Sequence, residues 1–117
     1  MKQEVAVISA SQPLVTEISS ILEQSNYSVL VLSDFAELEV YMRQRSGSVL
    51  ILDLDRLPVT NHLLRELKRK HPVTIVGVSA EKVHPALEES LRHHLFACLQ
   101  RPVDPDHLLL ILEGAFA

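Results

Sequence analysis

The chain has 117 residues, of which 47% are hydrophobic and 22% are charged, and its formal net charge is −4. This length supports one hydrophobic core, and the composition is that of a globular domain, neither disordered nor fibrous. The basic residues form no long run, Trp is absent, and the few Phe and Tyr are scattered. We therefore expect no direct nucleic-acid binding by this domain.

No apolar stretch is long enough to cross a membrane, because the longest run covers only residues 108–112. The first residues also lack the basic and apolar segments of a secretion signal. Cys98 is the single cysteine, which excludes an internal disulfide and suits a reducing compartment. We expect a cytoplasmic domain without membrane contact.

Five short apolar runs alternate along the chain with segments of helical spacing. In chain order, the expected strands are Val5–Ile8, Val29–Leu32, Val49–Leu52, Val73–Val78 and Phe96–Leu99. The first expected helix has an apolar face with Leu14, Ile18, Ile21 and Leu22, and the second begins at an N-cap at Ser33 or Asp34. The third contains the leucines 63, 64 and 67 and ends before His71-Pro72, and the fourth runs from about Pro85 through Leu91. The fifth begins at Asp104-Pro105, an N-cap followed by a proline.

This alternation predicts an α/β fold of (βα)₅ type. Because the expected strands are apolar throughout, each should be buried on both faces, as in a parallel sheet covered by helices. Right-handed crossovers leave few topologies, and the flavodoxin-like strand order 2-1-3-4-5 suits this length. We predict a three-layer sandwich that forms one domain over residues 1–117.

In such a sheet, functional groups lie at the carboxyl ends of the strands, near the point where the strand order reverses. In chain order, the segments at these ends are Ser9-Ala10-Ser11, Ser33-Asp34, Asp53-Leu54-Asp55, Ser79-Ala80 and Arg101-Pro102. No Gly-rich phosphate-binding loop follows the first expected strand, and the chain has only three glycines. A small doubly wound enzyme or nucleotide binder is therefore poorly supported, and we expect no enzyme activity.

Three segments resemble the receiver domains of response regulators: VLILDLDRLP at 49–58, VTIVGVSA at 73–80 and LQRPVDPDHLLLIL at 99–112. The resemblance spans the whole chain, and the three motifs occur in the family's order. It implies that Asp53 matches the phosphoacceptor aspartate and that Ser79 matches the hydroxyl residue that contacts a phosphoryl oxygen. It also implies that Arg101 stands at the position of the family's lysine.

The same resemblance places Ser9 and Ala10 where the family carries an acidic pair that holds Mg²⁺. Phosphoryl transfer to a carboxylate needs a divalent cation, and Mg²⁺ is usually bound through carboxylates. Asp55 lies two residues beyond Asp53 on a loop, and we do not expect its side chain to converge on the site. We therefore expect weak or absent Mg²⁺ binding and no cofactor.

Two other positions depart from the family pattern. Arg101 presents a planar guanidinium in place of a compact ammonium group. Cys98 stands where the family places a switch aromatic, and a cysteine in a strand is expected to be a small core residue. Because a buried carboxylate needs a partner, we expect Asp53 to pair with Arg101, or Arg101 to contact loop carbonyls.

The preferred interpretation is a pseudo-receiver that signals by protein contact, as the N-terminal regulatory domain of a longer protein with a transcriptional output domain. The alternative is a working receiver that a histidine kinase phosphorylates on Asp53. In the last expected helix, Leu109 lies on the flank of the buried face and Leu110 points nearly opposite to it. The resemblance implies pairing through the face formed by the fourth helix, fifth strand and fifth helix, so we expect a homodimer or a partner contact at Leu109 and Leu110.

Overall fold

The computed structural model describes residues 3–44, 48–55, 59–80 and 94–117. The sheet has five strands: β1 (Gln3–Ile8), β2 (Tyr27–Leu32), β3 (Val49–Asp53), β4 (Thr74–Ser79) and β5 (Ala97–Gln100). All neighbouring strands are parallel, in the order β2-β1-β3-β4-β5. The predicted strand order is thus confirmed, and the last two strands begin one residue later than expected.

The helices in the described part of the chain are α1 (Gln12–Gln24), α2 (Phe35–Arg43), α3 (Asn61–Lys70) and α5 (Pro105–Ala115). A side-chain hydrogen bond caps the start of α2, α3 and α5, whereas α1 begins at Gln12-Pro13 without one. Asp34 accepts a hydrogen bond from the backbone N of Glu37 and is therefore the N-cap of the two candidates, Ser33 and Asp34. Asp104 accepts one from the backbone N of Asp106, which confirms the N-cap predicted there. The helix predicted from Pro85 through Leu91 lies outside the described residues.

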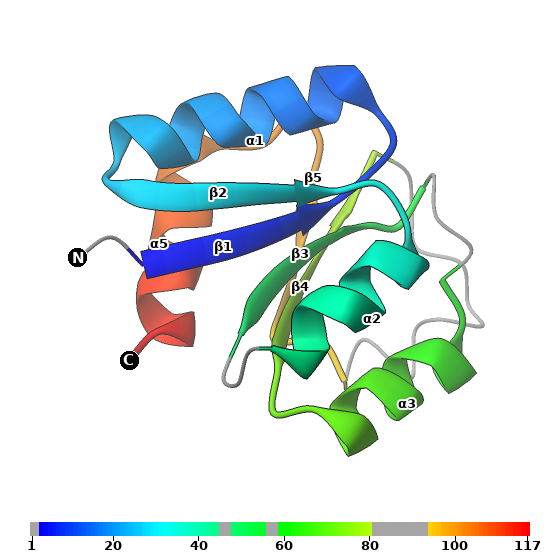
Figure 1. The fold of residues 1–117 in the computed structure, drawn as a ribbon. Helices are drawn as coiled ribbons and strands as arrows, with labels where there is room; N and C mark the ends of the chain where they lie inside the picture. Colours follow the sequence, from blue (N-terminus) through cyan, green and yellow to red (C-terminus); the bar gives the residue numbers. More distant parts are fainter. Residues whose placement is uncertain (1–2, 45–47, 56–58, 81–93) are drawn as a thin grey trace.

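Helices cover both faces of the sheet, with α1 and α5 on one side and α2 and α3 on the other (Figure 1). Successive side chains of a strand point to opposite faces, so each central strand contributes to two cores. In β1, Val5 and Val7 belong to the core under α1 and α5, while Ala6 and Ile8 belong to the core under α2 and α3. The predicted three-layer sandwich is confirmed.

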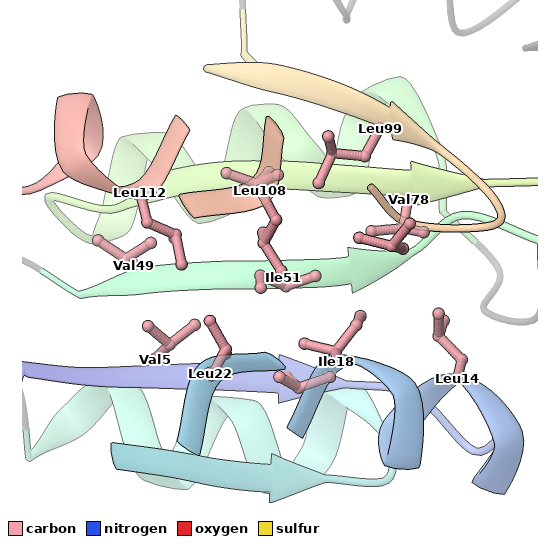
Figure 2. Close-up of a cluster of buried hydrophobic side chains, with 13 residues drawn as sticks. Val5, Leu14, Ile18, Leu22, Val49, Ile51, Val78, Leu99, Leu108 and Leu112 are labelled. Carbon is pink, nitrogen blue, oxygen red and sulfur yellow. The ribbon is translucent and has the colours of Figure 1, made fainter. Parts of the chain in front are cut away.

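The core under α1 and α5 is formed by leucine and isoleucine side chains that meet branched residues of the strands (Figure 2). Ile18 and Leu22 reach the sheet from α1, and Leu108 and Leu112 reach it from α5. All four are essentially inaccessible to solvent. The two helices are therefore fixed to the sheet by apolar burial, which is the main force that holds the layers together.

Burial on both faces holds for the three inner strands but not for the two edges. Val31 of β2 is 41% exposed, and Phe96 just before β5 is 52% exposed. An edge strand has a neighbouring strand on one side only, so its apolar side chains can be partly exposed. The apolar sequence of such a strand does not distinguish it from a fully buried one.

None of the helices in the described ranges is long and apolar enough to span a membrane.

Candidate functional site

The carboxyl ends of β1, β3, β4 and β5 meet at one edge of the sheet. Ser9 directly follows β1, Asp53 is the last residue of β3, and Ser79 is the last residue of β4. The register places Asp53 beside Val78, and Ser79 beside Gln100, so Arg101 follows at the same edge. This edge contains the reversal of strand order, because β1 and β3 are neighbours in the sheet.

Asp53 lies in the interior of this edge, with only 2% of its surface exposed. Its Oδ2 accepts a hydrogen bond of 2.7 Å from the Ser9 hydroxyl, and its Oδ1 accepts one of 3.1 Å from the backbone N of Asp55. A buried carboxylate without such donors would be strongly destabilising. Ser9 therefore binds the carboxylate from the position where the resemblance implies an acidic residue.

Ser9 is itself buried and held in place. Its backbone N donates to the carbonyl of Leu32 in β2, and its Oγ accepts a bond of 3.0 Å from the backbone N of Ser11. The hydroxyl thus receives one hydrogen bond and donates one, which fixes the direction of its proton toward Asp53. Ala10, next in the chain, is exposed and brings a methyl group only.

Asp55 turns toward the end of β4, contrary to the expectation that its side chain would not converge on the site. Its Oδ1 accepts a 2.7 Å hydrogen bond from the Ser79 hydroxyl. Its Oδ2 accepts a 2.6 Å bond from the backbone N of Ala80. Hydrogen bonds to an ionised acceptor are shorter and stronger than neutral ones. Asp55 therefore joins the loop after β3 to the end of β4.

Leu54 explains why the chain places Asp55 there. Its backbone N donates to the carbonyl of Val78 at 2.9 Å, which continues the pairing of β3 with β4 by one residue. Its side chain lies across Gly77 of β4, where an added Cβ would come within 2.8 Å of Leu54 Cδ1. Glycine in the middle of the strand leaves room for Leu54, and the next residue is directed toward Ser79.

Arg101 follows β5 at the same edge of the sheet. It is half-buried, and its backbone N donates to the carbonyl of Ser79 at 3.0 Å. Among the contacts between described residues, none joins the Arg101 guanidinium to the Asp53 carboxylate. Between described residues, Asp53 accepts hydrogen bonds from the Ser9 hydroxyl and from the backbone N of Asp55, one at each carboxylate oxygen.

Cys98 lies in a strand as predicted, but it is not a core residue. It is exposed on β5, which is the last strand of the sheet formed by the described residues. Partial burial of the thiol and, after it, the negative charge of Asp55 raise the pKa of Cys98. The second cause concerns the Cys98 thiol alone and places it within electrostatic range of the Asp55 carboxylate.

On α5, the two residues predicted as an interface differ in exposure. Leu109 is half-buried and packs against the core under α1 and α5, whereas Leu110 is 67% exposed. Phe96 lies near the same helix, since its Cζ would be 3.4 Å from a Cβ added to Gly114. Leu110 and Gly114 are four residues apart and share one side of the helix. Leu110, Gly114 and Phe96 thus form an exposed apolar surface, which we call the α5 patch.

The described part of the chain holds no group of three His, Cys, Asp or Glu side chains that could bind a metal ion. Each of the two carboxylates at the sheet edge already accepts hydrogen bonds through both of its oxygens. Ser9 and Ala10 add no charge to this set.

The family model of the response regulator receiver domain matches residues 5–113 of the chain. A comparison with curated proteins finds no significant match. Among solved structures, the signal receiver domain of an HD domain-containing protein from Pseudomonas fluorescens Pf-5 is similar, with a TM-score of 0.84 and 16% identity over 97% of this chain and 86% of that one.

Two further solved structures share the fold. The beryllofluoride-activated NtrC4 receiver domain dimer has a TM-score of 0.83 and 17% identity, over 97% of this chain and 95% of that one. The chemotaxis response regulator CheY4 of Vibrio cholerae has a TM-score of 0.74 and 20% identity, over 98% of this chain and 99% of that one. At these identities the likeness concerns the fold.

The coupling between Asp55 and Cys98 gives a testable prediction. Asp55→Asn removes one of the two causes of the raised pKa, so the thiol pKa should fall toward its ordinary value. More thiolate is then present near neutral pH, and alkylation by iodoacetamide should be faster. Because Cys98 is the only cysteine, rates measured across a pH series report this thiol alone. Asp106→Asn, which removes an exposed charge on α5, is the control, and identical profiles for Asp55→Asn and wild type would contradict the coupling.

Proposed function

The chain belongs to the response regulator receiver domain family, and on that premise we propose that it is an atypical receiver that signals by protein contact, largely independently of phosphorylation. The observation that supports this proposal most directly is the hydrogen bond from Ser9 to the buried carboxylate of Asp53. A neutral hydroxyl stands at the position of a metal-binding carboxylate, and it occupies an oxygen of the residue that matches the phosphoacceptor.

Weak Mg²⁺ binding is the chemical reason for this proposal. Transfer of a phosphoryl group to Asp53 would need a cation to neutralise charge on the phosphoryl oxygens. Mg²⁺ demands near-octahedral oxygen ligands and is usually bound through one or two carboxylates. Here Ser9 and Ala10 supply no carboxylate, and Asp55 is engaged with Ser79 and Ala80. The donor set therefore fits Mg²⁺ poorly, and we expect slow phosphorylation without any enzyme activity of the domain itself.

A working receiver phosphorylated on Asp53 is the second candidate. It is favoured by the location of Asp53 at the end of β3, with Ser79 and Arg101 at the ends of the adjacent strands. These residues match the positions that the resemblance assigns to the family's reaction. The atypical receiver and the working receiver differ in one measurable property. This property is the affinity with which the site around Asp53 binds Mg²⁺ together with a phosphoryl analogue.

We further propose that the α5 patch is a contact surface, in the first place for a second copy of the chain. Leu110 and Phe96 are large apolar side chains exposed on the same side of α5, and such clusters are typical of protein interfaces. One solved structure of the same fold is a receiver domain dimer. In this proposal, the contact passes the signal to a transcriptional output domain in a longer protein in the cytoplasm, and the domain itself binds neither nucleic acid nor membrane.

Beryllofluoride binding in the presence of Mg²⁺ tests the proposed function. For wild type, NMR shifts of residues near Asp53 should show no saturable change at millimolar Mg²⁺, because the cation lacks carboxylate ligands. The variant Ser9→Asp/Ala10→Asp restores an acidic pair and should show saturable shifts at lower Mg²⁺ concentrations. Saturable binding by wild type at modest Mg²⁺, equal to that of the variant, would support the working receiver instead.

Sedimentation across a concentration series tests the contact surface. Leu110→Glu places a charge in the α5 patch and should shift the association of wild type to higher concentration by at least tenfold, because burying an unpaired charge costs well over 1.4 kcal/mol. Val40→Glu is the matched control, since Val40 is 56% exposed on α2, on the opposite side of the sheet. Equal association by wild type and both variants would rule out this surface.

A further inference from the structure

The outer edge of β2 lacks the features that usually shield a strand from other strands. β2 is the first strand of the sheet formed by the described residues, and it pairs there with β1 alone. Charged residues, prolines and bulges commonly protect such edges. β2 has no charged residue and no proline, and its register with β1 is unbroken over six residues. The edge is therefore suited to pairing with a further strand.

One hydrogen bond shows which backbone groups of β2 face away from β1. The carbonyl of Leu32 accepts a bond of 3.0 Å from the backbone N of Ser9, which directly follows β1. In a strand, the N–H and C=O of one residue point to one side, and those of the next residue point to the other. The outward groups, one N–H and one C=O per residue, therefore belong to Tyr27, Val29 and Val31.

These outward groups are unpaired within the described part of the chain. No hydrogen bond between described residues joins the outward backbone groups of Tyr27, Val29 or Val31 to another residue. The next outward residue, Ser33, differs, because its backbone N donates to Glu37 Oε1 at 3.3 Å. The open part of the edge thus begins at Tyr27 and ends at Val31, and water meets its donors and acceptors in a single copy.

A second copy of β2 is complementary to this edge. In an antiparallel pair of copies centred on Val29, Val29 faces Val29 of the second copy, and Tyr27 faces Val31 at both ends. Facing residues of this kind exchange two hydrogen bonds, so every outward N–H and C=O of both copies finds a partner. A register centred on Leu30 places Tyr27 opposite Ser33, whose N–H is already bound. Backbone pairing therefore favours the register centred on Val29.

Side chains favour the same register. Val31 has an exposed apolar side chain, with 41% of its surface accessible. In this register it lies opposite Tyr27 of the second copy, and both side chains point to the face covered by α1 and α5. The ring of Tyr27 is held on that face by stacking on Phe116, with centroids 5.8 Å apart. Cross-strand pairs of an aromatic and a β-branched residue stabilise antiparallel strands, and β2 carries no charge that would repel its copy.

We propose that the outer edge of β2 is a contact surface for β2 of a second copy, in the antiparallel register centred on Val29. The two sheets then continue into each other across the contact. This surface is separate from the α5 patch, which includes Phe96 beside β5 at the other end of the strand order. It also does not depend on phosphorylation of Asp53. Because two short strands bury little area, the contact belongs to the weak class of protein interfaces and requires a high protein concentration.

Amide hydrogen exchange tests this pairing residue by residue. The measurements use Leu110→Glu, in which the α5 patch is blocked, in a concentration series up to about 1 mM. Protection of the three outward amides should rise about fivefold or more across the series, because these groups gain partners only in the pair. The amides of Ser28, Leu30 and Leu32 point to β1 and should change far less. This alternation is the signature of backbone pairing at the edge.

Val31→Pro tests the contact by sedimentation in the same background. The N–H of Val31 points away from β1, so proline removes no bond within the sheet, and edge strands tolerate proline at such positions. Each pair of copies loses two hydrogen bonds, so association should shift to about tenfold higher concentration or more. Val31→Thr keeps the N–H and the β-branched shape and is the matched control, which should associate like its parent. Val31→Lys leaves the backbone intact, places a charge at the edge and should also weaken association.

Association that survives both Val31→Pro and Val31→Lys unchanged would overturn the inference. Outward amides whose protection is independent of concentration would do the same, and they would leave the edge to a strand of another protein. Loss of all association in Leu110→Glu would also count against the β2 contact, while it would support the α5 patch. Beryllofluoride binding at Asp53 bears on the proposed function alone, so the failures are distinguishable.

Discussion

The buried carboxylate of Asp53 is the constraint on which this end of the molecule depends. A charged group with 2% exposure must be bound by donors on every available side, or it destabilises the fold. Its donors among the described residues include the Ser9 hydroxyl, at the end of β1, and the backbone N of Asp55, in the turn after β3. The need to satisfy one carboxylate therefore fixes the geometry of both segments, and through Asp55 it extends to β4.

The parallel sheet makes this arrangement possible. Apolar burial on both faces aligns β1, β3 and β4 so that their carboxyl ends meet at one edge. The polar groups at that edge then form a continuous series of hydrogen bonds from Ser11 through Ser9, Asp53 and Asp55 to Ser79. In our proposal this series takes the place of a metal and a phosphoryl group, and the α5 patch carries the contact with a partner.

The sequence was sufficient to predict the fold and the strand ends, because patterns of apolar residues determine burial and parallel pairing brings like ends together. Ser9, Asp53 and Ser79 were located in this way. Asp55 was not, because the direction of its side chain depends on Leu54 packing over Gly77, a contact between strands that no local pattern encodes. Cys98 was misplaced for a related reason: an apolar strand at a sheet edge has the same sequence pattern as a buried one, and only the strand order shows that β5 is the last strand.

The hydrogen bond between Ser9 and Asp53 is the central claim, and a double-mutant cycle measures it most directly. The free energy of unfolding is determined for wild type, Ser9→Ala, Asp53→Ala and the double variant. Our account predicts a coupling energy of about 1.5–3 kcal/mol, as expected for a buried hydrogen bond to a charged group. Effects of the two substitutions that add to within about 0.5 kcal/mol would contradict the account, because the hydroxyl would then not be a significant partner of the carboxylate.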